Sequence, residues 1–216
     1  MIANNLNKRI YTSIILFILI FLTLLFKPVL ALSLLIIGVF SLLEFFNIIK
    51  RSLKNKFFSF FSNLIFFIYV FSFCTIFFVL SYYQNFEFII FCLLFGCIAS
   101  DLGGFIFGKI FKGPKLTKIS PNKTISGSVG SIVLTIFVFS YSIFFFSKNF
   151  DYIIVITAII TSIACQSGDL FFSLLKRKAK IKDSGNFLPG HGGFLDRFDG
   201  IFLGIPIGFL SLMFFY

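Results

Sequence analysis

Charged residues are scarce in this chain, and their scarcity excludes the commonest class of protein. Only 12% of the 216 residues are Asp, Glu, Lys or Arg, whereas 58% are hydrophobic. A soluble globular domain carries about 25% charged residues. The composition therefore excludes a water-soluble domain and indicates an integral membrane protein.

Conventional metal-binding residue types are equally sparse. The chain has one histidine, and its four cysteines all lie within apolar runs without metal-ligand spacing. We therefore predict that the cysteines pack as small buried hydrophobic side chains.

Most of the chain consists of long apolar runs. Each run is about 17 to 27 residues long, which is enough to cross a bilayer. Helices are expected because the bilayer core offers backbone groups no water. We predict an all-α, polytopic transmembrane helical bundle with about seven spans. The predicted spans are 10–26, 28–49, 57–82, 86–111, 125–147, 150–176 and 198–216.

The net charge of +11 comes from short segments between the apolar runs. This distribution favours topology signals and anionic lipid head groups as its explanation, and we expect no nucleic acid partner. With a cytoplasmic N-terminus, 17 of the 19 lysines and arginines fall on the inner side, and only Lys27 and Lys148 fall outside. We therefore predict a cytoplasmic N-terminus, an outer C-terminus and a polar cavity that faces the cytoplasm.

Two small-residue stripes and one polar stripe repeat at helical spacing. The small residues indicate close helix packing. The polar residues share one helix face, which is expected to line a cavity or a neighbouring helix. The small-residue stripes are Gly96, Ser100, Gly104 and Gly108, and then Gly200, Gly204 and Gly208. The polar stripe is Ser162, Gln166, Asp169, Ser173 and Lys176.

An aspartate well inside the fourth apolar run is a functional candidate because ionisable residues are costly at that depth. This residue is Asp101, and the alternative is a hydrogen-bonded structural carboxylate. The glycines that follow it, Gly103 and Gly104, are expected to let the helix loosen.

A second candidate is the segment that precedes the fifth apolar run. Ser120 is predicted to cap a helix that begins at Pro121. The free N–H groups of such a helix would lie beside Lys123 and Thr124, which predicts an anion site.

The longest polar interruption near the C-terminus runs from Ser173 to Asp199. Carboxylates in and just before it are predicted to bind Mg²⁺, with a second cation left open, because Mg²⁺ prefers oxygen ligands. Its lysines and arginines are predicted to neutralise phosphates. Its glycines allow backbone to approach a ligand, and His191 is left open between ligand contact and turn structure. The metal candidates are Asp169, Asp196 and Asp199, and the phosphate candidates are Lys176, Arg177, Lys182 and Arg197.

The same interruption carries a recognisable motif. It reads Ser-x-Leu-Lys-Arg, four residues, Lys-Asp-x-Gly, two residues, then Leu-Pro-x-His-Gly-Gly-Phe-x-Asp-Arg-Phe-Asp. This pattern resembles the complete signature of the phosphatidate cytidylyltransferases, or CDP-diacylglycerol synthases. The stretches Asp101–Lys109 and Ser120–Gly127 resemble further family patterns. Glu44 and the phenylalanine after it resemble the family's early Glu-aromatic pair. The alternative for Glu44, which lies near an inner helix end, is a simple approach to Lys50 or Arg51.

The resemblance implies that CTP reacts with phosphatidate, using Mg²⁺, to give CDP-diacylglycerol and pyrophosphate for phospholipid biosynthesis. It implies a homodimer in the bacterial cell (inner) membrane, with the active site facing the cytoplasm. We predict N-terminal transmembrane helices over 1–85 and a catalytic transmembrane region over 86–216. The implied catalytic residues are Lys176, Lys182, Asp183 and Arg197, and the implied substrate-binding residues are Ser120, Lys123, Thr124, Asp101, Arg177, His191, Gly192 and Gly193.

Two other functions stay open from the sequence. An ion-coupled membrane transporter would use Asp101 and Asp169 on broken helices. A catalytically inactive homologue is the second alternative, because Ile125 and Ser126 stand where the family has Trp-Glu.

Overall fold

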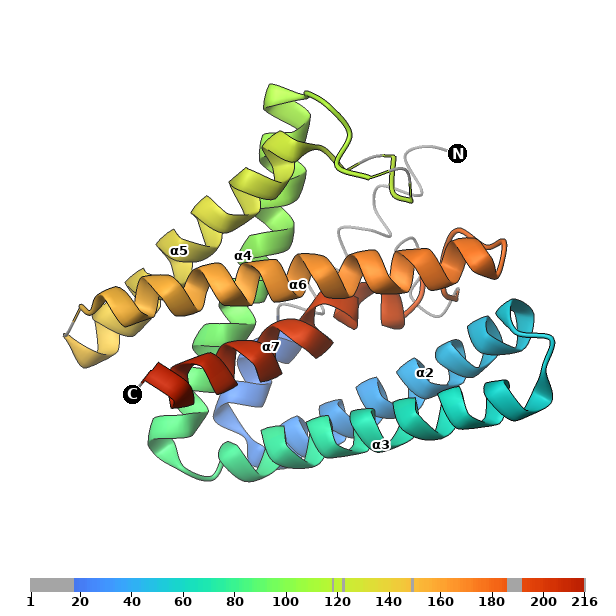
Figure 1. Ribbon diagram of the computed structural model, residues 1–216. Helices are drawn as coiled ribbons and strands as arrows, with labels where there is room; N and C mark the ends of the chain where they lie inside the picture. The colour runs from blue at the N-terminus through green and yellow to red at the C-terminus, as the bar shows by residue number, and fades with distance from the viewer. Residues whose placement is uncertain (1–17, 118, 122, 149, 186–191, 216) are drawn as a thin grey trace. The chain divides into compact units, whose positions relative to one another are not determined.

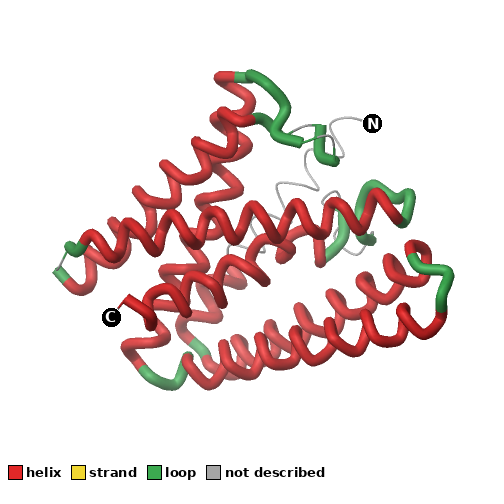
Figure 2. Tube along the Cα trace, in the orientation of Figure 1, coloured by secondary structure: helices red, strands yellow, loops and turns green. Residues whose placement is uncertain are grey.

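The described residues are almost entirely helical. The computed structural model describes residues 18–117, 119–121, 123–148, 150–185 and 192–215. Its helices are α2 (Lys27–Ser52), α3 (Lys56–Leu80), α4 (Gln84–Phe111), α5 (Ile125–Ser147), α6 (Tyr152–Lys178) and α7 (Leu195–Phe215), as Figure 1 shows. Within these described ranges there is no strand (Figure 2).

All six of these helices are long and apolar enough to cross a membrane. They correspond to the last six predicted spans, which confirms the all-α polytopic membrane bundle. Of the first predicted span, residues 18–25 are helical, and the part before residue 18 lies outside the described residues.

The chain divides into two compact units. The first consists of Met1–Val79 and Leu175–Arg197, and the second of Leu80–Leu174 and Phe198–Tyr216. Helices α2 and α3 belong to the first unit and α4 and α5 to the second, while α6 and α7 each contribute to both. The functional division at residue 85 stays a prediction.

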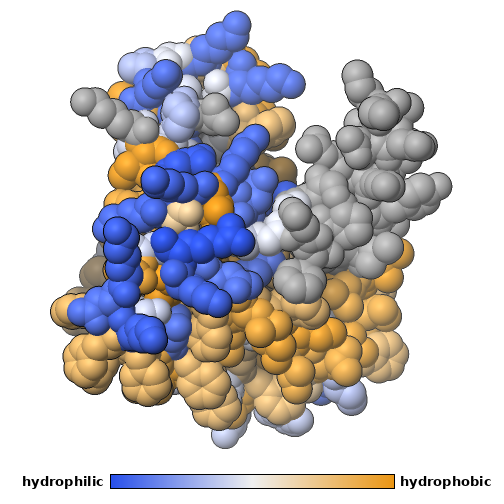
Figure 3. All heavy atoms as spheres, turned by 90° about the vertical axis from the view of Figure 1, so that its right-hand side faces the viewer, coloured by the Kyte–Doolittle hydropathy of each residue, from blue (hydrophilic) through white to orange (hydrophobic). Residues whose placement is uncertain are grey.

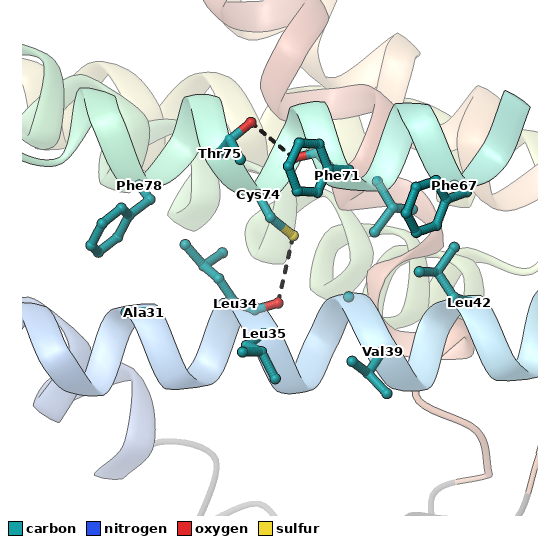
Figure 4. Close-up of a pocket in the computed structure, with 12 residues that line it drawn as sticks. Ala31, Leu34, Leu35, Val39, Leu42, Phe67, Phe71, Cys74, Thr75 and Phe78 are labelled. Atoms are coloured by element: carbon teal, nitrogen blue, oxygen red, sulfur yellow. Dashed lines mark hydrogen bonds between the residues drawn. The ribbon is translucent and has the colours of Figure 1, made fainter. Parts of the chain in front are cut away.

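In the first unit, α2 and α3 lie side by side (Figure 1). Pro28 stands in the first turn of α2, where its missing N–H leaves no hydrogen bond unmade. Apolar side chains of both helices line a groove of about 360 Å³ (Figure 4). The half-buried thiol of Cys74 donates to the Leu34 carbonyl at 3.5 Å in this groove. The cysteine therefore packs between helices, as predicted.

In the second unit, small residues let α4 and α5 approach closely. A Cβ added at Gly103 would lie 2.5 Å from the carbonyl oxygen of Gly130, and one at Gly104 would lie 2.8 Å from Ser131 Oγ. The Ser131 hydroxyl donates to the Ser100 carbonyl at 2.7 Å. Helix α4 continues through Gly103 and Gly104, so the expected loosening there was wrong. These glycines permit close packing instead, because their missing side chains bring the two backbones together.

The small-residue stripe on α7 (Gly200, Gly204 and Gly208) also permits close helix packing within the second unit. A Cβ at Gly200 would lie 2.5 Å from Cys165 Sγ, and one at Gly204 would lie 2.5 Å from Cys97 Sγ. Both thiols are buried and unbridged. The small residues of α7 therefore fit it against α4 and α6, which confirms the packing explanation.

Large apolar side chains cover much of the outer surface of the helices. Phe57 is 65% exposed, Phe105 68% and Phe137 67%. Figure 3 shows a broad hydrophobic surface on the face that it views. Exposed apolar area of this extent is uncommon on soluble monomers, and lipid contact explains it.

The start of α5 differs from the prediction. This helix begins at Ile125, and Thr124 caps it by accepting the Gly127 N–H on its Oγ1 at 3.1 Å. Ser120 lies in a turn, where its carbonyl accepts the N–H of Lys123 at 3.1 Å. The predicted cap at Ser120, with Pro121 opening the helix, was therefore wrong.

The physical reason lies in the segment that leads into α5. Its backbone folds back on itself, so that Leu116 N–H donates to the Lys123 carbonyl and Ile125 N–H donates to the Pro114 carbonyl. These bonds hold the residues around Pro121 in a turn. The first residue able to cap a helix after that turn is Thr124.

Replacement of Thr124 by alanine is expected to lower the free energy of unfolding by about 1 kcal/mol, because the Gly127 N–H loses its acceptor. For a chain of this size the melting temperature in detergent should fall by roughly 2–4 °C. Ser120→Ala is the control and should leave the melting temperature within about 1 °C. A larger loss in Ser120→Ala than in Thr124→Ala would contradict the assignment of the cap.

Candidate functional site

The predicted site residues come together in two groups, one in each unit. The group in the first unit, here called the Asp196 cluster, consists of Asp196, Lys176, Ser184 and Gly193. Lys176 Nζ lies 2.6 Å from Asp196 Oδ1. The backbone N–H groups of Ser184 and Gly193 donate to Asp196 Oδ2 at 2.8 and 3.1 Å. The two charged side chains are only 11% and 13% exposed, so this ion pair is largely shielded from water.

The chain reaches this arrangement through a sharp reversal after α6. The Ile181 N–H donates to the Lys176 carbonyl at 3.0 Å, which turns the backbone back after the helix ends. Gly192 has φ +84°, a conformation that glycine adopts without steric cost. A Cβ at Gly192 would lie 3.2 Å from Asp196 Oδ2 and 3.6 Å from Asp183 Cβ. Asp183 and Gly192 therefore border the cluster, whereas their catalytic and substrate-binding roles stay predictions.

Three further cations of the motif are exposed. Arg177 donates from Nη1 to the Ile181 carbonyl at 3.2 Å, near the end of α6. Lys182 lies in the turn that follows, and Arg197 lies in the first turn of α7. His191 lies outside the described residues. The signature segment thus combines a shielded ion pair with three exposed cations, and such excess positive charge suits an anionic ligand.

Helix α7 begins at Leu195, three residues earlier than predicted. The N–H groups of Phe194 and Leu195 both donate to the carboxylate of Glu44, at 2.9 and 2.8 Å. An anionic group at a helix N-terminus satisfies donors that the helix itself leaves unpaired. Asp196 and Arg197 therefore lie inside the helix, in its first turn.

The hydrogen bonds of Glu44 were not predicted from the sequence. Its expected approach to Lys50 or Arg51 is replaced by bonds to residues about 140 to 151 positions later in the chain. The side chain is 1% exposed, and the Ser184 hydroxyl donates to it at 2.5 Å. The signals that pointed to it were its place as the lone carboxylate in an apolar run and its resemblance to the Glu-aromatic pair.

The group in the second unit is built on Asp169 of α6. Lys123, which directly precedes the cap of α5, forms an ion pair with Asp169. The Ser173 hydroxyl also donates to Asp169 Oδ1 at 3.3 Å. The lysine and aspartate side chains are 25% and 29% exposed. This pair is more accessible than the ion pair of the Asp196 cluster, so a ligand anion meets less resistance in competing for the lysine.

The polar stripe of α6 pairs with neighbouring helices. Ser162 Oγ lies 3.1 Å from Ser100 Oγ of α4. Gln166 donates from Nε2 to the Ser128 carbonyl at 3.3 Å, and the Ser128 hydroxyl donates back to the Gln166 side chain. For this part of the stripe the second of the two expected outcomes, a neighbouring helix, is confirmed.

The two remaining candidate aspartates lie in the same unit. Asp199 is 6% exposed and accepts the Gly200 N–H on Oδ1 at 2.9 Å. Asp101 is exposed, and Cys165 Sγ lies 3.8 Å from its Oδ1. Helices α4 and α6 continue without a break at Asp101 and at Asp169. The broken helices that a transporter would require at these aspartates are therefore missing from α4 and α6.

The carboxylates fit only a particular kind of metal site. Among the residues that the structure describes, no three His, Cys, Asp or Glu side chains are grouped closely enough to hold a metal ion. Asp169 and Asp196 each have a lysine partner instead. Mg²⁺ is usually held by one or two carboxylates together with substrate phosphates. The described donors fit such a substrate-completed site and do not fit a cage made by the protein alone.

Comparisons with known proteins agree with the motif. The model of the cytidylyltransferase family matches residues 47–215. The phosphatidate cytidylyltransferase of Rickettsia felis is 47% identical over 129 residues, which cover 54% of this chain and 56% of that protein. Those of Staphylococcus haemolyticus and Helicobacter pylori are 43% and 39% identical, over 50% and 57% of this chain and 42% and 46% of theirs.

The chain spans about half the length of the curated relatives that it matches. The family model, by contrast, covers well over half of the chain and includes both groups of site residues. The resemblance inferred from the motif is thereby confirmed. This protein belongs to the cytidylyltransferase family.

Proposed function

We propose that this protein transfers the cytidylyl group of CTP to phosphatidate, which gives CDP-diacylglycerol and pyrophosphate. The observation that carries the proposal is the Asp196 cluster, in which residues from both ends of the signature meet around one carboxylate. The relatives named phosphatidate cytidylyltransferase support the choice of substrates.

The reaction exchanges one phosphoanhydride bond for another. An oxygen of the phosphatidate phosphate attacks the α-phosphorus of CTP, and the bond from that phosphorus to the bridging oxygen breaks. Pyrophosphate leaves with the bonding electron pair. Because both reactants are anions, such a transfer depends on positioning and on neutralisation of charge more than on covalent help from the protein.

The chain's own cations account for this neutralisation. Lys176 is held by Asp196 and therefore presents a charge of fixed position. Lys123 stands at the start of α5, where the helix N-terminus adds partial positive charge. In the proposal Lys182, Arg177 and Arg197 bind phosphates from exposed positions. Asp183 completes the proposed catalytic set. The other proposed substrate-binding residues are Asp101, Ser120, Thr124, Gly192 and Gly193, together with His191, which lies outside the described residues.

Mg²⁺ is part of the proposal, and Asp169, Asp196 and Asp199 are its candidate ligands. Bound with the phosphates of CTP, it would supply charge neutralisation at the reacting oxygens. Asp169 and Asp196 are each paired with a lysine, so in this proposal the metal takes the place of that lysine at the carboxylate.

The location is proposed as the bacterial inner membrane, with the site facing the cytoplasm. The bacterial sources of the relatives support the first part, and the distribution of lysine and arginine supports the second. A homodimer is proposed from the resemblance alone. The small residues do not add support for it, because in the second unit they pack α4, α5 and α7 within one chain.

The test is an assay of the purified protein in detergent with radiolabelled CTP, phosphatidate and Mg²⁺. Label should appear in lipid-extractable CDP-diacylglycerol, and omission of phosphatidate or addition of EDTA should abolish it. A folded protein that forms no labelled lipid under these conditions would contradict the proposal. That result would favour the inactive homologue, in which Ile125 and Ser126 replace residues that the reaction needs.

A further inference from the structure

Glu44 is a buried carboxylate that the proposed reaction does not use directly. It is 1% exposed and lies near the C-terminal end of α2. Three donors meet its two oxygens: Ser184 Oγ and Leu195 N–H on Oε2, at 2.5 and 2.8 Å, and Phe194 N–H on Oε1, at 2.9 Å. A buried charge persists only when it is paired or fully hydrogen-bonded, and these three bonds meet that condition.

Two glycines of the signature are explained by this carboxylate. A Cβ at Gly185 would overlap Glu44 Oε1 and lie 2.8 Å from its Cδ. A Cβ at Gly193 would overlap Glu44 Oε2 and the Ser184 hydroxyl, and would lie 2.6 Å from the Gly185 N atom. Both positions therefore lack a side chain because the carboxylate takes the space beside them.

An aromatic contact adds to the same attachment. The rings of Phe40 and Phe194 stack, with centroids 5.1 Å apart and planes inclined by 16°. Phe40 precedes Glu44 by four residues, so the two side chains lie on one face of α2. One face of this helix thus holds the signature segment by a hydrogen-bonded anion and by a ring.

Every residue that Glu44 bonds stands next to a member of the Asp196 cluster or belongs to it. Ser184 donates its hydroxyl to Glu44 and its backbone N–H to Asp196. Phe194 and Leu195 join Gly193 to Asp196 along the chain, and Gly193 N–H donates to Asp196 at 3.1 Å. A shift of the segment away from Glu44 would therefore move the donors that fix Asp196.

We propose that Glu44 is a positioning residue for the cytidylyl transfer, which anchors Ser184, Phe194 and Leu195 to α2 and so holds Lys176 and Asp196 in reacting geometry. The inference rests on the proposed function. It requires a carboxylate, because two oxygens accept from three donors. A glutamine would offer one oxygen and would turn its own N–H₂ group toward at least one donor.

The test compares Glu44→Gln with Glu87→Gln, which changes the only other glutamate of the chain. Glu87 lies in the first turn of α4, in the second unit. For Glu44→Gln we expect kcat to fall ~100-fold, as a displacement of about 1 Å costs in other enzymes, while KM for CTP changes less than about threefold. Glu87→Gln should keep the wild-type kcat. Glu44→Asp restores two acceptor oxygens on a shorter stem and should recover part of kcat.

Hydrogen–deuterium exchange gives a readout that does not need activity. Peptides that contain the amides of Phe194 and Leu195 should exchange faster in Glu44→Gln, while peptides from α3 and α5 stay at their wild-type rates. Faster exchange across all helices would indicate a general loss of structure and would overturn the positioning role. A wild-type kcat in Glu44→Gln would also overturn the positioning role, as would an unchanged exchange rate at the amides of Phe194 and Leu195. An inactive wild-type protein would instead overturn the proposed function on which the inference rests, and the assay separates these two failures.

Discussion

Replacement of Asp196 by asparagine is expected to lower the rate of CDP-diacylglycerol formation by ~1000-fold or more, a loss typical of removing charge at a preorganised site. The carboxylate accepts from Lys176, Ser184 and Gly193 at once, so its loss frees the lysine from its fixed position. Labelled CTP in the lipid assay measures the effect. Asp151→Asn is the matched control, because Asp151 lies outside both groups, just before α6, and should keep its rate.

The same substitution should also destabilise the protein, and the two effects can be separated. Breaking a buried ion pair by changing one partner costs about 3–5 kcal/mol, because the other charge stays buried without it. The double variant Lys176→Met, Asp196→Asn removes both charges and should regain much of the melting temperature without regaining activity. A wild-type rate of CDP-diacylglycerol formation in Asp196→Asn would contradict the assignment of Asp196 to the active site.

Replacement of Gly168 by alanine is expected to destabilise the protein through a steric clash between two helix backbones. A Cβ at this position would lie 2.5 Å from the Asp199 carbonyl oxygen and 3.3 Å from Gly200 Cα, both of which are backbone atoms of α7. Since backbone cannot rotate aside, α6 and α7 must separate here. Overpacking of this kind costs about 3 kcal/mol, and the melting temperature in detergent should fall by roughly 6–12 °C.

The position of Gly168 also links this packing to the chemistry. It directly precedes Asp169, and the atoms that it faces belong to Asp199 and Gly200, so activity should fall together with stability. Gly38→Ala is the control, because a Cβ there would meet only Cys74 Sγ at 3.5 Å and Val70 Cγ1 at 3.6 Å. That variant should keep or raise the melting temperature, since alanine favours a helix over glycine. Equal losses in both variants would contradict a specific close contact at Gly168.

The spans were predictable because the bilayer imposes a length and a composition on each of them. Helix α4, for example, was expected over 86–111 and is found at Gln84–Phe111. The polar face of α6 was predictable for a similar reason, since a regular helix converts spacing into direction. The sequence also placed Lys176 and Asp196 in one motif, although only the fold shows that they form an ion pair.

The features that were missed depend on contacts that no local pattern records. The cap of α5 moved from Ser120 to Thr124 because the preceding backbone pairs with itself, and both residues are chemically able to cap. The start of α7 moved to Leu195 because of an acceptor on α2. Periodicity describes a helix once it has begun, whereas the first residue of a helix is decided by whichever acceptor reaches its N–H groups.

The bonds of Glu44 have a consequence for the biogenesis of the protein. Ser184 follows Glu44 by 140 residues. At synthesis rates of about 5–20 residues per second, the carboxylate waits roughly 7 to 28 s before its first donor has been translated. During that time α3, α4, α5 and α6 are made, and Glu44 depends on water or on lipid head groups for hydration. The complete set of hydrogen bonds that buries this carboxylate therefore forms only after Ser184, Phe194 and Leu195 have been made.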